Sequence, residues 1–440
     1  MPMLTIGLNV VYVLLLAALT PWLVYRRVAQ RKAIAGLADK FWGRVARKNP
    51  ERPCVWFHAV SVGEVLQLQH LLAEFSRRHP DVEVLLTTTT ATGYEVAREK
   101  FPQHTLAYWP LDFSWAVARA LRSVRPQLVV LVELELWPNF LLAAQREKVP
   151  VILINGRIGA KSHRGYARLR WFWRRPLSAV THAAVQTDEY ARRLVDLGIS
   201  ADRVSVTGNI KYDRVQSDRA NPHTAELRTA FGLSTDELVF VAGSTQEPEE
   251  RFALDAWQTL RQEIPALRLL LVPRHKERFS AVARLVTERG LPLLRRSALS
   301  APGKASPSGL PPVLLLDTLG ELAAAWGLAD IAFVGGSLTQ RGGQNMLEPA
   351  GYGAAILFGP NTWNFRAIVE ALLARNAACV VRDADELRET VRRLAHDAHE
   401  RQRLGAAARA FVLAQQGATV RTLELLDAHW PASRSLPAAA

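Results

Sequence analysis

The sequence predicts an α/β protein made of two doubly wound parallel sheets, preceded by an apolar N-terminal helix. From Cys54 onward, apolar runs rich in Val, Ile and Leu alternate with segments of helical period. The alternation pauses in a polar stretch between Asp213 and Glu237 and then begins again. The chain has 440 residues, 49% of them apolar, which is long for one compact domain and sufficient for two packed cores.

The N-terminal run from Leu4 to Leu23 reads LTIGLNVVYVLLLAALTPWL and carries no Asp, Glu, Lys or Arg. Its length is that needed to cross the hydrocarbon core of a bilayer. A cleaved signal peptide is the alternative, but no Lys or Arg precedes the run and no small-x-small site is evident after it. We therefore expect a membrane anchor over residues 1–25.

Residues 26–50 form a basic juxtamembrane segment with a single acidic residue, Asp39. Its basic residues are Arg26, Arg27, Arg31, Lys32, Lys40, Arg44, Arg47 and Lys48. By the positive-inside rule, the bulk of the chain is expected on the cytoplasmic side. The formal net charge is +14, half of it in this segment, and the basic and aromatic alternation of a nucleic-acid module is not seen elsewhere. We therefore expect an anionic lipid surface as a partner and no nucleic acid.

Residues 51–213 are predicted to form a first Rossmann-like domain. The predicted strands are CVWFHAV, VEVLLTTT, LVVLVEL, VPVILIN, AAVQT and VSVTG. Continuous apolar strands separated by helices indicate a parallel sheet that is covered on both faces.

A linker over 214–236 and a second Rossmann-like domain over 237–410 follow, and then a C-terminal helix and tail over 411–440. The predicted strands of this domain are LVFVAG, LRLLLVP, PVLLLD, DIAFVGG, AAILFG and ACVV. Because ligands of such sheets bind at the carboxyl ends of the strands, we expect a cleft between the two domains. The architecture serves glycosyltransferases, sugar-nucleotide epimerases and two-lobed binding proteins alike, so the fold does not choose among them.

In the first domain, charged residues follow the predicted strands. Glu64 follows the first strand, where it is either a helix-end charge or a base at the rim of the cleft. Glu133 and Glu135 lie at the end of LVVLVELEL and are expected to share a face unless the strand ends between them. Their structural alternative is an ion pair with Arg157 or Lys211. Lys211, in GNIKYD, suits a phosphate or a developing oxyanion.

In the second domain, three segments at strand ends suit an anionic ligand. They are Pro273 and Arg274 in VPRHKERF, Gly320, Glu321 and Leu322 in DTLGEL, and the glycine-rich stretch Gly335–Pro360 with Asn345 and Glu348. A guanidinium can hold a phosphate in a bidentate manner, and glycine-rich turns and helix starts offer backbone N–H groups to phosphates. A tight turn without a ligand is the alternative for the glycines. The histidines lack ligand-like spacing, so no metal site is expected.

Eight motifs together resemble the 3-deoxy-D-manno-octulosonic acid (Kdo) transferases. They are HAVSVGE, TTTTATGYE, VELELWPN, GNIKYD, VPRHKERF, DTLGEL, FVGGSL and GGQNMLEPAGYGAAILFGPNTWNF, in order from the anchor to about residue 420. The resemblance implies a membrane-associated GT-B glycosyltransferase of the cell inner membrane that is inverting, metal-independent and without a cofactor. It also implies transfer of Kdo from the donor CMP-Kdo to a lipid A precursor (lipid IVA).

The resemblance further implies roles for individual residues. Glu64 matches the proton acceptor, and Glu133 and Lys211 match positions that stabilise the transition state. The segments matching those that bind CMP contain Pro273, Arg274, Gly320, Glu321, Leu322, Asn345, Met346, Leu347 and Glu348. Gln344 and Met346 replace the histidine and proline of the family's usual GGHNPLEP, which puts contacts of the histidine in doubt. Another GT-B transferase acting on a lipid-linked sugar, a sugar-nucleotide epimerase and a lipid-tethered binding protein are the alternatives.

Overall fold

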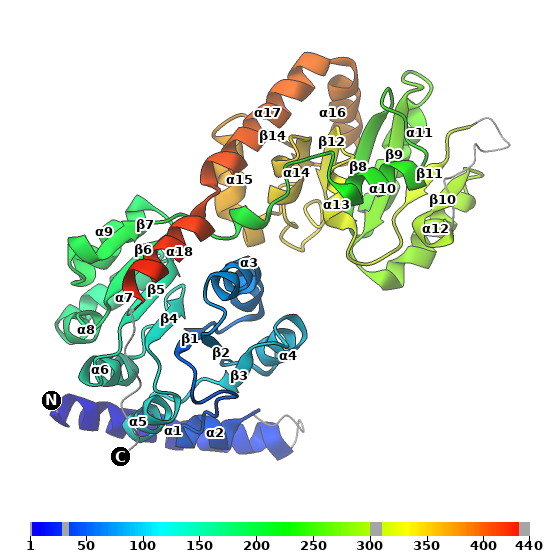
Figure 1. The fold of residues 1–440 in the computed structure, drawn as a ribbon. Helices are drawn as coiled ribbons and strands as arrows, with labels where there is room; N and C mark the ends of the chain where they lie inside the picture. The colour runs from blue at the N-terminus through cyan, green and yellow to red at the C-terminus, as the bar shows by residue number, and fades with distance from the viewer. Residues whose placement is uncertain (1, 29–34, 300–309, 431–440) are drawn as a thin grey trace. The chain divides into compact units, whose positions relative to one another are not determined.

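The computed structural model describes residues 2–28, 35–299 and 310–430, which divide into two compact units. Unit 1 comprises Met1–Asp213 together with Gln416–Ala440, and unit 2 comprises Arg214–Gln415. Each unit contains a seven-stranded sheet in which every pair of neighbouring strands is parallel (Figure 1). The prediction of two doubly wound parallel sheets is therefore confirmed.

The sheet of unit 1 has the strand order β3-β2-β1-β4-β5-β6-β7. Its strands are β1 (Cys54–His58), β2 (Glu83–Thr88), β3 (Thr105–Tyr108), β4 (Leu128–Val132), β5 (Val151–Gly156), β6 (His182–Val185) and β7 (Val204–Val206). Its helices are α1 (Pro2–Val28), α2 (Leu37–Trp42), α3 (Val62–Arg78), α4 (Ala91–Lys100), α5 (Ser114–Val124), α6 (Pro138–Arg146), α7 (Ala160–Arg168), α8 (Arg170–Leu177), α9 (Asp188–Leu197) and α18 (Ala418–His429).

The first sheet is buried on both faces, as its continuous apolar strands predict. Trp56 of β1 belongs to a core cluster with residues of α5 and α6, whereas its neighbours Val55 and Phe57 belong to a second cluster with residues of α3. Helix α18 returns from the C-terminal end of the chain and adds Leu423 and Leu426 to this second cluster. The sequence patterns do not reveal that the last helix completes the core of the first unit.

The sheet of unit 2 has the strand order β10-β11-β9-β8-β12-β13-β14. Its strands are β8 (Leu238–Thr245), β9 (Leu267–Pro273), β10 (Leu293–Arg295), β11 (Val313–Leu315), β12 (Ile331–Val334), β13 (Ala355–Phe358) and β14 (Ala378–Val380). Its helices are α10 (Pro222–Ala230), α11 (Glu249–Leu260), α12 (Phe279–Thr287), α13 (Leu322–Trp326), α14 (Leu347–Gly351), α15 (Arg366–Leu373), α16 (Ala384–His396) and α17 (Ala398–Gln415).

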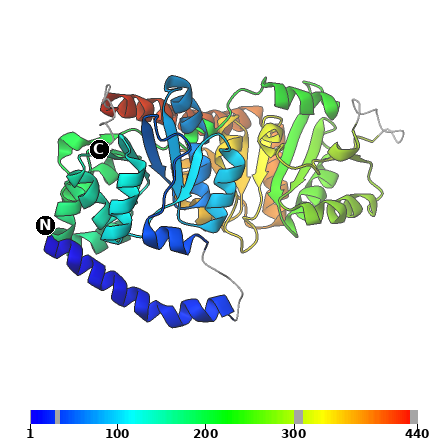
Figure 2. The ribbon, with the colours of Figure 1, turned by 60° about the horizontal axis from the view of Figure 1, so that its bottom comes forward.

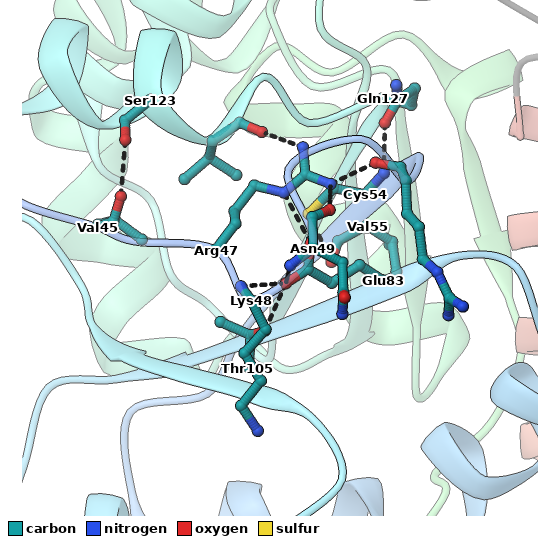
Figure 3. A network of polar contacts seen from close by, with 12 residues as sticks. Val45, Arg47, Lys48, Asn49, Cys54, Val55, Glu83, Thr105, Ser123 and Gln127 are labelled. Atoms are coloured by element: carbon teal, nitrogen blue, oxygen red, sulfur yellow. Dashed lines mark hydrogen bonds and ion pairs between the residues drawn. The ribbon is translucent and has the colours of Figure 1, made fainter.

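The basic segment over 26–50 differs from its prediction, because several of its cations bind protein groups. Arg47 forms an ion pair with Glu83, in which the Nε–Oε2 distance is 2.8 Å and the two side chains are 2% and 3% exposed (Figure 3). The buried Lys40 donates to the carbonyl oxygen of Thr89, and the Nζ of Lys48 donates to that of His104. Arg31 and Lys32 lie outside the described residues, as do the side chains of Arg26 and Arg27.

The Glu83 carboxylate fastens this segment to the first sheet. It also accepts hydrogen bonds from the backbone N–H groups of Lys48 and Asn49 and from the hydroxyl of Thr105 (Figure 3). Buried charges with this many partners are structural, so Arg47 and Glu83 are assigned to the stability of unit 1 and not to lipid binding.

Glu83→Gln is expected to destabilise the protein by about 3 kcal/mol, because it leaves the Arg47 guanidinium buried without a counter-ion. Chemical denaturation of the full chain measures this change. The matched control is Glu74→Gln, which removes an ion pair with Arg77 at the surface of α3 and should leave the midpoint unchanged. Equal effects of the two substitutions would contradict the structural role of the buried pair.

Candidate active site

The carboxyl ends of β1 and β4 meet at the switch point of the first sheet. The two strands are neighbours, with His58 paired to Leu131, but the chain leaves them in opposite directions across the sheet. Ligands of doubly wound sheets bind at this point. Glu64 follows β1, and Glu133 and Glu135 follow β4, so all three predicted carboxylates lie at this edge.

Glu64 lies in the first turn of α3 and takes part in a variant of the capping box, in which its carboxylate binds the N–H of the residue before the N-cap. Its backbone N–H donates to the hydroxyl oxygen of Ser61, the N-cap residue, at 3.3 Å. Its carboxylate accepts from the backbone N–H of Val60 at 2.9 Å and from the hydroxyl of Ser61 at 2.7 Å. The helix-end alternative is therefore realised in the structure. Each carboxylate oxygen has two lone pairs, so these bonds leave an acceptor site on each oxygen.

Glu133 lies close enough to Glu64 and to the predicted cation Lys211 for both charges to affect its pKa. Strand β4 ends at Val132 and Glu133 has a φ of 62°, so the expected strand alternation does not govern the two glutamates. Burial, followed by the nearby charge of Glu64, raises the pKa of Glu133, while Arg157 and Lys211 oppose the rise. The structure thus brings Glu64, Glu133 and Lys211 together within unit 1.

Glu135 completes a group of three carboxylates. Burial, followed by the charges of Glu64 and Glu133, raises its pKa to about 7, although the indole N–H of Trp137 donates to it at 3.0 Å. Its Oε2 lies 3.8 Å from the Nε2 of His58. A carboxyl group with such a pKa is partly protonated at neutral pH and can donate as well as accept a hydrogen bond.

His58, the last residue of β1, is a polar residue that was not predicted as part of the site. Its side chain is fully buried, and its ring stacks on Trp109 with ring centroids 3.9 Å apart. Burial lowers the pKa of His58 to about 3, so the ring stays neutral beside Glu135. Its Nδ1 lies 3.2 Å from the carbonyl oxygen and the hydroxyl of Thr87. The only sequence signal is a histidine that ends a buried strand.

Three amide side chains, near the ends of β5 and β7 and on α3, position these charged groups. Asn155, with a φ of 53°, donates from its Nδ2 to the Oε1 of Gln67 and accepts from the backbone N–H of Ile210. Gln67 lies one turn after Glu64 on α3 and hydrogen-bonds Glu133. Asn209 accepts from the backbone N–H of Lys211 at 2.9 Å. This network was missed, because nothing in the sequence shows that NGR and GNIK meet.

The predicted ligand segments of unit 2 also lie at carboxyl ends of strands. Pro273 is the last residue of β9, and the N–H of the exposed Arg274 donates to the carbonyl oxygen of Thr245 at the end of β8. Gly320, with a φ of 89°, and Glu321 follow β11 and precede Leu322, the first residue of α13.

Gly320 and Glu321 line a cavity of about 550 Å³ within unit 2. Its other lining residues are Gln216, Asn221, Pro222, His223, Glu226, Leu319, Ala323, Ala324 and Tyr352. The volume lies in the range of small-molecule sites. The Glu321 carboxylate accepts from Arg296 at 2.9 Å, so its charge is partly balanced within the unit.

Asn345–Glu348 lead into the short helix α14, which begins at Leu347 after the N-cap residue Met346. The Nδ2 of Asn345 donates to the Oε1 of Glu348 at 2.9 Å, and its Oδ1 accepts from the N–H of Leu347. The side chains of Met346 and Leu347 are fully buried, so these two residues can offer a ligand only their backbone. The hydrophobic core therefore accommodates the side chain of Met346 at the position where the family usually has proline.

The first glycine pair of Gly335–Pro360 differs from its predicted use. The buried carboxylate of Glu249 accepts hydrogen bonds from the N–H groups of Gly336, Ser337 and Leu338 at 2.7–3.0 Å. These amides are already engaged by a carboxylate of the protein, so their expected contact with a phosphate is wrong in this structure. A Cβ at Gly335 would lie 2.5 Å from the Cα of Thr245, which explains that glycine by packing.

Among the described residues, no group of three or more His, Cys, Asp and Glu side chains could hold a metal ion. The metal-independence of the activity remains a prediction from the resemblance.

Glu135→Gln is expected to stabilise the protein at neutral pH. With a pKa near 7 when folded and 4.5 as its ordinary value, Glu135 binds more proton in the folded state between these pH values. The free energy of unfolding therefore falls as pH rises through that range, by up to about 3 kcal/mol. Thermal melts should show no difference between variant and parent at pH 4.5 and a higher Tm of the variant at pH 7.5. A difference independent of pH would contradict the raised pKa.

Comparisons with known proteins agree with the motifs. The family model described as 3-deoxy-D-manno-octulosonic-acid transferase (kdotransferase) matches residues 35–214, and a glycosyl transferase-like model matches residues 329–427. The UDP-GlcNAc 2-epimerase structure from Neisseria meningitidis has a TM-score of 0.55 at 13% identity, covering 85% of this chain and all of that one, which shows the fold alone.

Two curated relatives are similar along most of their length. The 3-deoxy-D-manno-octulosonic acid transferase of Bordetella pertussis is 36% identical over 95% of this chain and 98% of its own. That of Haemophilus influenzae is 33% identical over 88% of this chain and 89% of its own. The chain therefore belongs to the Kdo transferase family of glycosyltransferases.

Proposed function

We propose that this protein transfers Kdo from CMP-Kdo to a lipid A precursor at the cytoplasmic face of the inner membrane, with inversion and without a metal ion. The gathering of Glu64, Glu133 and Lys211 at the switch point of the first sheet is the observation that carries this proposal. These residues come from three separate motifs, and the family resemblance assigns all three to the chemical step.

Glu64 is the proposed base. Its carboxylate takes the proton of the acceptor hydroxyl, the hydroxyl oxygen attacks the anomeric carbon of Kdo, and the bond from that carbon to the phosphate oxygen breaks. The electron pair of that bond leaves with CMP. The capping hydrogen bonds hold the Glu64 carboxylate in one orientation, which reduces the entropy lost on reaching a productive geometry.

Glu133 and Lys211 are proposed to stabilise the transition state. A carboxylate stabilises the positive charge that develops at the anomeric carbon, and an ammonium group stabilises the negative charge of the departing phosphate. In unit 2, Arg274, the Gly320–Leu322 turn and Asn345–Glu348 are proposed to bind CMP, supported by the cavity beside Gly320 and Glu321. The cations and backbone amides of these segments would then supply the charge stabilisation that other transferases obtain from a metal ion.

The activity is tested by incubating the full chain with CMP-Kdo and a tetraacylated disaccharide lipid A precursor in detergent and weighing the lipid products. A mass increase by one or more Kdo units is expected. No increase in a preparation that binds CMP-Kdo would contradict the proposal.

Glu64→Gln is expected to lower the transfer rate by at least about 10²-fold, because glutamine cannot take a proton. Glutamine preserves a capping box, so the Tm should change little. The matched control is Glu386→Gln in α16, where Asp383 is the N-cap and the carboxylate accepts from the N–H of Arg382 in the same way. That variant should keep full activity, and an active Glu64→Gln variant would reduce Glu64 to a helix-end residue.

A further inference from the structure

Figures 1 and 2 show helix α1 beside the rest of unit 1. The burial of its residues differs from one face of the helix to the other. The residues Thr5, Leu8, Asn9, Tyr12 and Leu16 are partly buried and recur at helical spacing, so they form the face toward unit 1. The segment Leu4–Trp22 is otherwise apolar and long enough to cross a membrane. Its polar side chains are Thr5, Asn9, Tyr12 and Thr20, and all of them except Thr20 lie on the inner face.

Asn9 binds the start of α5 through both ends of its amide. Its Nδ2 donates to the hydroxyl of Ser114 at 2.7 Å, and its Oδ1 accepts from the N–H of Ser114 at 3.0 Å. The Nδ2 of Asn139 donates to the same Oδ1 at 3.3 Å. This two-point contact fixes the position of α1 along its axis and its rotation.

Tyr12 lies one turn after Asn9 and adds a third contact. Its hydroxyl donates to the Oδ2 of Asp112 at 2.9 Å, and its ring packs edge-on against Phe113. Asp112 is buried and also accepts from the N–H groups of Asn139 and Phe140. The helix is therefore joined to a polar, hydrogen-bonded part of unit 1.

These contacts are incompatible with a helix that crosses a bilayer. If α1 crossed a bilayer with Trp22 at the membrane surface, Asn9 would lie about 20 Å deeper, because a helix rises about 1.5 Å per residue. The part of unit 1 that binds Asn9 would then have to lie at the same depth. Thr5 lines a small hollow with Arg146 and Arg175, so two arginines would be carried deeper still. Charged groups at such depth cost several kcal/mol each.

The outer face of α1 is a continuous apolar surface. Its exposed large side chains are Ile6, Val10, Val11, Val13, Leu14, Leu15, Leu19, Trp22 and Tyr25. Trp42 and Trp115 are also exposed, and both contact Phe41, which packs on the same Phe113 as Tyr12. Tryptophans at the border of an apolar face are typical of a membrane interface.

A basic surface adjoins the N-terminal end of α1. Between Lys161 and Arg175, helices α7 and α8 carry six Lys and Arg residues and no Asp or Glu. Trp171 is 79% exposed. It lies one turn before Arg175, which lines the small hollow together with Thr5. The surface suits the anionic headgroups next to an inserted apolar helix.

We propose that α1 lies in the plane of one leaflet of an anionic bilayer, held to unit 1 by Asn9 and Tyr12, and does not cross the membrane. The proposal does not depend on which sugar the enzyme transfers.

The first test compares the sides of the membrane on which two cysteines lie. One variant carries a Gly-Ser-rich extension with a single Cys before Met1, and the other is Glu99→Cys on the exposed surface of α4, both with Cys379→Ser. Cys54 is fully buried, and the Cys379→Ser parent is the labelling blank. A membrane-impermeant maleimide should label both cysteines from the same side of sealed vesicles. Labelling from opposite sides would overturn the proposal.

The second test uses a short bis-methanethiosulfonate crosslinker in native membranes. The pair Asn9→Cys and Ser114→Cys should crosslink, because their native side chains are in hydrogen-bond contact. The matched control is Gly7→Cys with Ser114→Cys, because Gly7 lies on the open face of α1. Absence of a crosslink for the first pair, or equal crosslinking of both pairs, would overturn the docking of α1.

The third test is flotation of the purified chain with phosphatidylcholine vesicles that contain or lack 30% phosphatidylglycerol. The parent should partition about tenfold more onto the anionic vesicles. Replacement of Arg170, Arg174 and Arg175 by Gln should remove that preference and keep the binding by α1. An unchanged preference would overturn the assignment of α8 to the lipid surface.

Discussion

The architecture of unit 1 brings three carboxylates to one edge of a sheet, and the structure around them has to accommodate their mutual repulsion. Glu64, Glu133 and Glu135 reach this edge from the two strands at the switch point. Burial and like charge raise the pKa of Glu133 and Glu135, and that of Glu135 reaches about 7, so Glu135 is partly protonated at neutral pH. Arg157 and Lys211 supply positive charge beside Glu133, and the amide network holds the backbone of Lys211.

The capping contacts of Glu64 are compatible with its proposed role as the base. Its carboxylate accepts from the backbone N–H of Val60 and the hydroxyl of Ser61, and these two hydrogen bonds fix its orientation at the start of α3. The proposed base therefore keeps one orientation while an acceptor site remains on each of its oxygens.

The buried strands could be predicted from the sequence because they are continuous apolar runs between turns. The two missed strands, β3 and β10, are the edge strands of the first and second sheets, and most of their residues are only partly buried. An edge strand needs no long apolar run, so the pattern is weak. The placement of Glu64, Glu133 and Lys211 followed from the rule that ligands bind at carboxyl ends of parallel strands.

Other features depend on tertiary contacts that a pattern does not contain. Composition marks Arg47 as a surface cation, whereas the fold pairs it with Glu83 in the interior. Paired glycines suggest a phosphate loop, whereas Glu249 engages the amides of the first pair. The apolarity of α1 predicts a membrane helix but not the partners of Asn9 and Tyr12, which lie about one hundred residues away in the chain.

The most direct test is a titration of the glutamate carboxyl carbons by NMR, in the parent and in Glu64→Gln. If the three carboxylates face one another, removing the charge of Glu64 lowers the pKa of both Glu133 and Glu135 toward the ordinary value of about 4.5. If both pKa values are the same in the two proteins, the carboxylates do not share an edge and the proposed catalytic group is contradicted.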